Sequence, residues 1–476
     1  MKQKLLLLFG LFLISLTNNA QIEVTKSTID ASTPAKPYAV ATADLTNDGN
    51  IDIAIGTYDS SSVLWYKNNG DDTFATGITL SATGTAALSY IESITIADLN
   101  NDGYNDILAT GSYNDKLVWF ENNGDETFEP AVLIATGIAG AGAVKVANID
   151  NDVNNYLDIV VTAYTSNSVV YFLGNGDGTF ETVRTLVLES AGAGPASFDI
   201  ADYDNDGDLD VVVGYTGNGD VKLYDNTVVQ DGLDIDGNVT FVPYTNTVDS
   251  GNGWLWSVIF ADVNNDGNLN IVKSDSEPTS GNPTLSWFTN DTSGTDTTFT
   301  ETIVSTSFPH GGAVSVIDLD NNGFNDLILG NSYVSGVDLI CFEGNASGTL
   351  GTEIVLDNST GSIFSMALAD FNNDSNIDIA VISYLANDLT VFYNNTTLST
   401  IQFESTDVVL YPNPTKDVLL FEGLNSDITV SVFDLLGKQV LSQPLGIGES
   451  LNVSKLANGI YTININNEVT SKFIKE

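Results

Sequence analysis

An acidic stretch of about nine residues recurs seven times in this 476-residue chain, and it constrains the possible folds more than any other feature. The clearest copy is DYDNDGDLD at 202–210. Successive copies lie about 50 to 60 residues apart, a period typical of repeat architectures in which each copy is one supersecondary unit. The seven copies begin at Asp44, Asp98, Asn148, Asp202, Asp262, Asp318 and Asp370.

Short apolar segments flank every copy. One precedes it, as at 93–97, and another follows it, as at 209–214. A third is aromatic, as in VLWY at 63–66, and a fourth follows a turn such as NNGDDTF at 68–74. These segments are rich in β-branched and aromatic residues and are bounded by Gly, Asn and Asp, which predicts strands. Four strands in each of seven units predict an all-β fold, a seven-bladed β-propeller.

The two ends of the repeat region predict how the ring closes. The seventh unit stops after its third strand, at residues 394–395. The segment IEVTKSTI at 22–29 reads as a fourth strand that lacks the other three. We therefore expect the N-terminal strand to complete the seventh blade, because an open ring would leave exposed sheet edges.

Each acidic stretch presents oxygen atoms at alternate positions, with glycine at the sixth. Side chains at positions 1, 3, 5 and 9 of such a tight loop can turn inward together, and position 7 usually contributes its carbonyl. A hard dication prefers six to eight such oxygens, and Ca²⁺ suits the flexible geometry better than Mg²⁺. Position 12, for example Ile55, lies in an apolar strand, so the helical EF-hand is excluded.

The copies are not equivalent. Thr46 stands at position 3 of the first loop, Asn270 at position 9 of the fifth and Ser375 at the glycine position of the last. The third copy has Val153 in place of glycine and two extra residues, so we expect it to be empty or distorted. For any single loop, the alternative is an Asx-rich turn without metal. The candidate calcium ligands are Asp44, Thr46, Asp48, Asn50, Asp52, Asp98, Asn100, Asp102, Tyr104, Asp106, Asp202, Asp204, Asp206, Asp208, Asp210, Asp262, Asn264, Asp266, Asn268, Asp318, Asp320, Asn322, Phe324, Asp326, Asp370, Asn372, Asp374, Asn376 and Asp378.

Tyrosines recur at the opposite end of the predicted blades, in the connections between the second and third strands. Trp254 and Trp256 lie where the first strand of the fifth blade begins, on the same face. Rings beside polar loops suit sugar faces or extended peptides. The alternative is that these rings pack between blades. The candidate ligand-face residues are Tyr58, Tyr113, Tyr164, Tyr215, Tyr333, Tyr384, Trp254 and Trp256.

The repeats resemble the FG-GAP/VCBS family, whose calcium-loop blades also occur in integrin α-subunit propellers. The resemblance covers roughly residues 22–397 and depends on D-x-D/N-x-D-G-x-x-D followed by an apolar strand and N-G-D-x-T-F. It implies structural Ca²⁺ in the hairpin between the first two strands of a blade.

The sequence pattern changes after a linker at 398–406. The blocks YPNP, FDLLGK and ANGIYTI, within residues 407–476, resemble the type A sorting domain of the type IX secretion system. This resemblance implies a small C-terminal β-sandwich and transport across the outer membrane of a Bacteroidota-like bacterium by that secretion machinery. The alternative is a plain immunoglobulin-like adhesive domain.

Charge and the N-terminus narrow the location and partners. The formal net charge is −47, with 62 acidic and 15 basic residues, so nucleic acid is excluded as a partner. Lys2 and Lys4 precede an apolar run at 5–16, and small residues follow it at the expected cleavage site. This pattern predicts a signal peptide at 1–20. We find no later apolar stretch of spanning length. The protein is therefore expected to be secreted or on the outer cell surface.

These features favour a binding or adhesion module for an extracellular glycan or protein. The alternative is an extracellular carbohydrate-active enzyme, a polysaccharide lyase or hydrolase, on the same propeller. His310 is the single histidine, and no nucleophile-elbow or phosphate-binding glycine motif is present. We therefore assign no catalytic residue from the sequence.

Overall fold

The computed structural model describes residues 22–189, 192–234, 237–244, 246–251, 254–275, 285–289, 299–305, 310–332, 337–396, 409–422, 428–434, 438–446, 448–465 and 469–476. The predicted signal peptide at 1–20, the linker at 398–406 and Tyr333 lie outside these residues. The chain divides into two compact units, one spanning Ala20–Leu398 and one containing Ser399–Glu476. In the part of the chain that the structure describes, we find no helix with the length and apolarity needed to cross a membrane.

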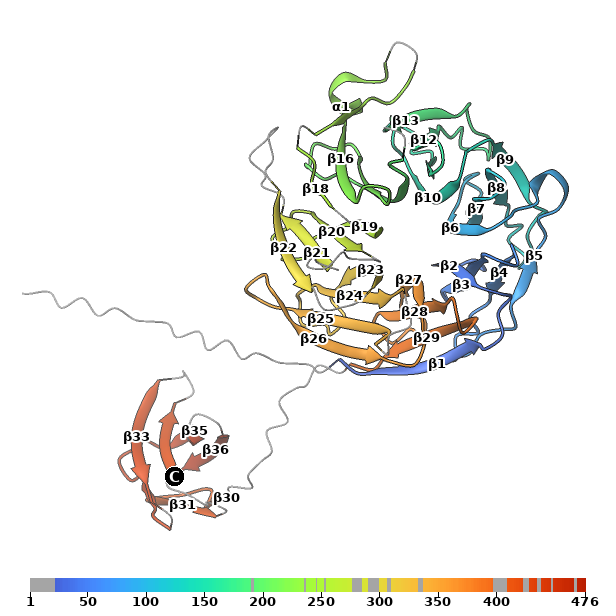
Figure 1. The fold of residues 1–476 in the computed structure, drawn as a ribbon. Coiled ribbons are helices and arrows are strands. Elements are labelled where there is room, and N and C mark those ends of the chain that lie inside the picture. The colour runs from blue at the N-terminus through green and yellow to red at the C-terminus, as the bar shows by residue number, and fades with distance from the viewer. Residues whose placement is uncertain are drawn as a thin grey trace, which may run out of the picture. The chain divides into compact units, whose positions relative to one another are not determined.

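Within the described residues, the first unit consists of seven antiparallel sheets, here called blades one to seven. Figure 1 shows them arranged in a ring. Blades one to three comprise β2 (Pro37–Ala43), β3 (Asp52–Thr57), β4 (Val63–Tyr66) and β5 (Ile78–Leu80); β6 (Ile91–Ala97), β7 (Asp106–Gly111), β8 (Lys116–Phe120) and β9 (Val132–Thr136); and β10 (Ala141–Ala147), β11 (Asp158–Ala163), β12 (Ser168–Phe172) and β13 (Arg184–Leu188).

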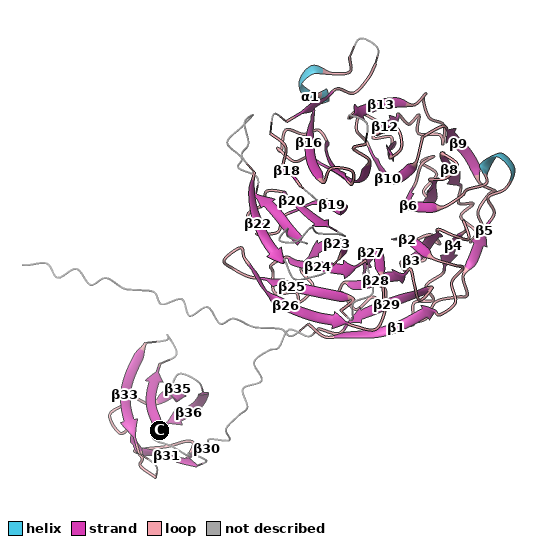
Figure 2. Cartoon of the chain, viewed as in Figure 1, coloured by secondary structure: helices cyan, strands magenta, loops and turns pink. Residues whose placement is uncertain are grey.

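Blades four to seven continue the pattern, with one irregularity in blade four. There β18 (Asp249–Ser250) also pairs with β16, and the short helix α1 (Val228–Asp231) follows that strand. The strands are β14 (Pro195–Ala201), β15 (Asp210–Tyr215), β16 (Asp220–Asn226) and β17 (Phe241–Pro243); β19 (Leu255–Ala261), β20 (Asn270–Asp275), β21 (Leu285–Thr289) and β22 (Thr300–Ser305); β23 (Gly311–Ile317), β24 (Asp326–Asn331), β25 (Leu339–Gly344) and β26 (Leu350–Asp357); and β27 (Ile363–Ala369), β28 (Asp378–Ser383), β29 (Asp388–Asn394) and β1 (Val24–Asp30). The 3-10 helix η1 (Gly84–Ala86) precedes blade two (Figure 2).

The N-terminal strand closes the ring, which confirms the sequence prediction. β1 pairs antiparallel with β29, with Val24 opposite Asn394 and Thr28 opposite Thr390. The innermost strands also contact one another in order, and β27 contacts β2. Blade seven therefore joins the two ends of the propeller sequence through a full set of backbone pairings.

The hydrophobic core lies between the blades. Seven clusters of buried residues each combine side chains from two consecutive blades, the last from blades seven and one. The second strand of every blade is buried at all six positions because a neighbouring blade covers each face. This explains why most of these strands read as nearly continuous apolar runs rather than alternating ones. The exception is β20, which buries the ion pair of Lys273 and Asp275.

Buried asparagines connect neighbouring blades. In blade two, Asn122 is 1% exposed, and its Nδ2 donates to the carbonyl oxygen of Leu45 in blade one at 2.8 Å. Asn68, Asn226 and Asn394 make the equivalent bond to the preceding blade. These residues lie at the end of the third strand or two residues after it, and the sequence analysis did not predict their bonds to the neighbouring blade.

The C-terminal unit is a small all-β domain of two sheets. One contains β30 (Val409–Tyr411), β31 (Val418–Glu422) and β34 (Leu451–Asn452), and the other contains β33 (Gln439–Leu445), β32 (Ile428–Phe433), β35 (Gly459–Ile465) and β36 (Val469–Lys475). A single buried cluster takes residues from both sheets, including Leu419, Val430, Ile463 and Phe473. Alternating burial along β32 and β35 is typical of sheets with one solvated face.

Candidate functional site

The acidic loops connect the first and second strands of each blade and share one backbone shape. The asparagine at position 4 is left-handed in all seven copies, with φ between 52° and 63°. In the six nine-residue loops, position 6 also has positive φ, +99° at Gly207, a conformation that glycine adopts at little cost. Ser375 takes the same place at φ 74° in the last loop. The glycine in the motif is thus explained by backbone geometry.

The first carboxylate of each loop accepts hydrogen bonds from the loop's own backbone. In the first loop, Asp44 Oδ1 accepts from Asp48 N at 3.2 Å and Asp44 Oδ2 accepts from Gly49 N at 2.8 Å. Asp98, Asp262, Asp318 and Asp370 repeat this pair of bonds. The loops are therefore preorganised around their acidic side chains.

The carboxylate at position 9 is buried and also holds the blade together. Asp106 is 0% exposed, and its Oδ1 and Oδ2 accept from Asn122 N at 2.8 Å and Leu99 N at 3.1 Å. Asp52, Asp158, Asp210, Asp326 and Asp378 make the same two bonds. Apart from Asp158, these residues were predicted only as metal ligands, yet each also ties the loop to the end of the third strand.

Burial raises the pKa of these position-9 carboxyl groups. Desolvation is the main cause, and the two backbone hydrogen bonds oppose it. The pKa rises to about 6 for Asp52 and Asp378, about 7 for Asp106, Asp158 and Asp326, and about 8 for Asp210. A nearby cation would favour the ionised form, so the buried acids fit a bound metal.

Two loops bring enough carboxylates together to hold a metal ion. In blade six, one oxygen each of Asp318, Asp320 and Asp326 lie within 4.8 Å of one another. In blade four, Asp202, Asp204 and Asp206 do so, and a second group joins Asp206 to Asp208 and Asp225. Asp208 was expected to contribute its main chain, but its side chain is also buried beside the loop. The ligand assignments in the remaining loops stay predictions.

The third loop differs from the others, as its sequence suggested. Val153 is 99% exposed, and Asn155 takes positive φ two residues later. The opening residue Asn148 uses its amide to donate to Asp152 O at 3.1 Å and to Asn155 Oδ1 at 3.2 Å. An amide–carbonyl bond thus occupies a place where the other loops have a carboxylate.

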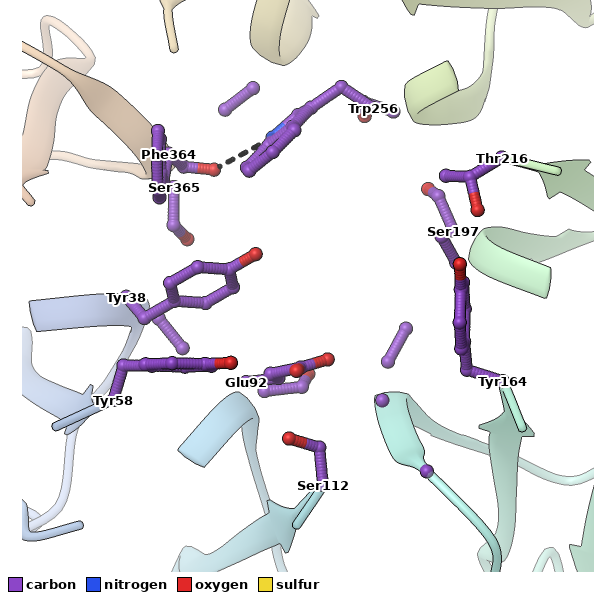
Figure 3. Close-up of a pocket in the computed structure, with 18 of the residues that line it drawn as sticks. Tyr38, Tyr58, Glu92, Ser112, Tyr164, Ser197, Thr216, Trp256, Phe364 and Ser365 are labelled. Carbon is purple, nitrogen blue, oxygen red and sulfur yellow. Dashed lines mark hydrogen bonds between the residues drawn. The ribbon is translucent and has the colours of Figure 1, made fainter. Parts of the chain in front are cut away.

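A cavity of about 730 Å³ lies at the other end of the first strands, where they enter the centre of the ring (Figure 3). The pairing of the first and second strands shows that the second residue of each first strand occupies the same position in its blade. These seven residues are Tyr38, Glu92, Gly142, Ala196, Trp256, Gly312 and Phe364. Large aromatic side chains from blades one, five and seven therefore face small residues from blades three and four.

The aromatic side of the cavity forms a continuous array. Tyr58 stacks on Tyr90 with centroids 4.5 Å apart, and Tyr38 lies 5.3 Å from Tyr58. Phe364 contacts Trp256 at 4.6 Å, and Trp256 Nε1 donates to Phe364 O at 3.2 Å (Figure 3). Because Trp256 belongs to blade five and Phe364 to blade seven, this bond spans the first strand of blade six.

Glu92 is the charged side chain among the described residues that line the cavity. Its pKa lies above the ordinary value because burial desolvates the carboxylate, while a side-chain hydrogen bond with Ser112 opposes this shift. Ser197, Thr216 and Tyr164, from blades three and four, also line the cavity with hydroxyl groups (Figure 3). The cavity thus combines ring faces with a few hydrogen-bonding groups.

The predicted aromatic face is only partly assembled at this cavity. Tyr58, Tyr113, Tyr164, Trp254 and Trp256 line it. Tyr384 lies behind Phe364, with centroids 4.5 Å apart.

Tyr215 does not belong to this face, so its prediction is wrong. It is 1% exposed, and its hydroxyl bonds to that of Tyr224 at 2.8 Å. Tyr215 is the last residue of β15 and not part of the following loop, so its side chain packs into the core. Tyr38, Tyr90, Glu92 and Phe364 were missed, although alignment of the repeats by strand register could have revealed three of them.

Comparison with known proteins supports the division of the chain. The FG-GAP-like repeat family matches residues 44–109, 98–155, 153–213 and 318–381, and the secretion system C-terminal sorting domain family matches 409–476. No curated protein matches the chain.

Solved structures share the fold at low sequence identity. Two crystal structures of BBS1N in complex with ARL6DN, soaked with lead or mercury, match with TM-score 0.50. They are 10% and 12% identical, and the matches cover 78% and 79% of this chain and 96% and 99% of theirs. An Agrocybe aegerita lectin that recognises non-reducing terminal N-acetylglucosamine has TM-score 0.48 and 22% identity, over 77% of this chain and 87% of its own.

The chain is thus a propeller-like protein built from FG-GAP-like repeats. It ends in a type IX sorting domain, which makes it a secreted or cell-surface protein.

Proposed function

We propose that this protein is an extracellular, calcium-stabilised binding module whose central cavity takes a carbohydrate ligand. The aromatic cavity carries the proposal. Its volume lies within the usual range for small-molecule sites, and aromatic ring faces beside hydroxyl and carboxyl groups can orient such a ligand. Exposed rings at its rim, Tyr113 at 75%, Trp254 at 61% and Tyr164 at 46%, offer flat faces on which a sugar ring can stack.

The charge of the cavity favours a neutral or cationic glycan over an acidic one. Glu92 is negative when ionised, and the lining of the cavity, as far as the structure describes it, contains no lysine or arginine. The chain as a whole carries a formal net charge of −47. A uronate- or sulfate-rich polymer would therefore be repelled both on approach and on binding.

Calcium in this proposal stabilises the propeller and does not contact the ligand. The acidic loops join the ends of the first strands to the second strands, whereas the cavity lies at the beginnings of the first strands. The clustered carboxylates of blades four and six would hold the ion, and their buried, raised-pKa aspartates fit a cation. Ca²⁺ would supply the positive charge that these groups lack. Extracellular calcium is abundant enough to keep sites of about 10⁻⁴–10⁻³ M occupied.

The enzyme alternative has no specific observation in its favour. Glycoside hydrolysis generally requires two carboxyl groups about 5 to 9.5 Å apart. The described lining of the cavity offers one, Glu92.

A glycan array probed with the calcium-loaded full chain tests the proposal, followed by calorimetry with the best oligosaccharide. Tyr164→Ala and Trp254→Ala should each weaken binding about tenfold, since a stacked ring contributes about 1.4 kcal/mol. The control Ile78→Ala removes a 50%-exposed side chain on the outer strand β5 and should bind like wild type. Equal affinity in all four proteins would refute the cavity as the site. Retention of an extracellular protein but no glycan would refute the ligand class.

A further inference from the structure

Blade four has an acidic side chain at position 7, which the other nine-residue loops lack, and a second one after its third-strand aromatic residue, where blades two and six have Glu121 and Glu343. At position 7 it has Asp208, where the other five nine-residue loops have asparagine or an aromatic residue. At the end of its third strand it has Asp225, next to Asn226. Together with Asp202, Asp204, Asp206 and Asp210, these residues place six carboxyl groups around one hairpin.

The additional acids form a group distinct from the first carboxylates of the loop. One oxygen each of Asp206, Asp208 and Asp225 lie within 4.8 Å of one another. Asp208 is 2% exposed; its Oδ2 accepts from Val229 N at 3.1 Å, but its Oδ1 is buried without a hydrogen-bond partner. Asp225 Oδ1 is buried in the same way. Leaving such an oxygen unpaired is costly, so the pocket between the two oxygens calls for a positively charged partner.

Blade one shows how the same place is neutralised elsewhere. Strand register aligns Tyr66 with Tyr224, so the next residue, Lys67, is the equivalent of Asp225. Lys67 Nζ lies 3.4 Å from Asp48 Oδ2, and Asp48 is the position-5 residue equivalent to Asp206. In blade one the protein itself supplies the cation, whereas blade four has a further carboxylate in its place. Among the described residues, no lysine or arginine forms an ion pair with Asp206, Asp208 or Asp225.

We propose that blade four binds a second divalent cation, held by Asp206, Asp208 and Asp225, beside the site formed by the loop itself. Asp206 is shared between the two ions, since it belongs to both groups of carboxylates. All the available ligands are hard oxygen atoms, which suit Ca²⁺. The second ion links the hairpin to the end of β16, as the Lys67–Asp48 pair does in blade one.

Native mass spectrometry of the full chain, saturated with Ca²⁺, tests this proposal because it counts bound ions directly. Asp225→Asn and Asp225→Lys should each bind one calcium fewer than wild type. When calcium is removed, the melting temperature of Asp225→Lys should fall less than that of Asp225→Asn, because the lysine replaces the charge of the second ion. The control Asp220→Asn makes the same charge change at the other end of β16 and should bind as many ions as wild type.

The outcomes separate this inference from the proposed calcium role. If wild type binds calcium and Asp225→Asn binds the same number, the second site does not exist, and a proton shared by Asp206 and Asp208 neutralises the group. If wild type binds no calcium, both the stabilising role and the second site are refuted. An anomalous map of calcium-soaked crystals would distinguish two ions on either side of Asp206 from one ion on the loop.

Discussion

Single buried side chains connect one blade to the next. Asn122 makes three hydrogen bonds from a position that is 1% exposed. Its Nδ2 donates to the carbonyl oxygens of Leu45 and Asn105, and its Oδ1 accepts from Gly124 N. Because Leu45 belongs to blade one, this buried side chain links two blades.

Replacing Asn122 should therefore destabilise the propeller. We expect Asn122→Ala to lower the free energy of unfolding by about 1–3 kcal/mol, since it leaves buried backbone groups without partners. Urea unfolding in calcium measures this. The control is Asn123→Ala, whose side chain makes an exposed bond to Thr127 Oγ1. An equal loss of unfolding free energy in the two variants would show that the link between blades does not contribute to stability.

Glu92 gives the central cavity a pH dependence. Its raised pKa means that the folded state binds a proton more tightly than the unfolded chain, whose glutamate has a pKa near 4.5. The resulting stability is fully present below about pH 4.5 and is lost as the pH rises through the folded pKa. Glu92→Gln should therefore be more stable than wild type at pH 8, and this advantage should disappear by pH 4. Thermal unfolding across this range measures it.

The control for this series is Glu353→Gln, an exposed position on the outer strand β26. It should change stability little at any pH. If the stability difference between Glu92→Gln and wild type stayed constant from pH 4 to pH 8, the prediction would be wrong. Such a result would mean that the pKa of Glu92 does not change on folding.

At this scale, the sequence predicted regular spacing better than it predicted side-chain surroundings. The acidic residues were found because they repeat at fixed positions within a loop. Tyr38, Glu92 and Phe364 belong to a ring that exists only when seven first strands are aligned, and their identities differ from blade to blade. Tyr215 was misplaced by one residue, which is enough to move a side chain from a loop into the core.

At the scale of strands, β1 is the element on which closure depends. Its partner β29 lies more than 350 residues away in sequence, so the ring closes only after the whole propeller has been made. Deleting residues 22–30 would leave the backbone of β29 unpaired along one edge. We expect a large fall in melting temperature or association of the truncated chains, measured by calorimetry and light scattering.

The control for the deletion is Lys26→Ala. This substitution removes side-chain bonds to Ser359 and Asp357 but keeps the backbone pairing, so it should cost about 1 kcal/mol or less. A deletion that melts like wild type and stays monomeric would mean that β1 does not stabilise the ring.

The strand pattern was predictable because two-sided burial and tight turns leave clear marks in the sequence. Aromatic third strands recur in all blades, and largely apolar second strands recur in all except blade five. The departures occur where blade four inserts α1 and β18 after its third strand, since a single insertion has no repeat to reveal it. The predicted signal peptide and linker lie outside the described residues.

At the scale of the whole molecule, a highly acidic ring has to accommodate many buried carboxyl groups. The propeller carries its aspartates in loops on one end of the blades and its aromatic cavity at the other. Without cations, the buried position-9 carboxylates have pKa values of about 6 to 8, so at neutral pH the folded state is strained by desolvated or protonated acids. Bound calcium would remove this penalty in several blades at once.

Thermal unfolding of the full chain at pH 7.5, in calcium and in a chelator at matched ionic strength, tests the central claim most directly. At about ten to a hundred times the dissociation constant, each occupied loop adds about 1.4–2.7 kcal/mol to the free energy of unfolding. We predict a clearly higher midpoint in calcium that magnesium at the same concentration does not reproduce. Identical midpoints in calcium and chelator would contradict a propeller held closed by divalent cations.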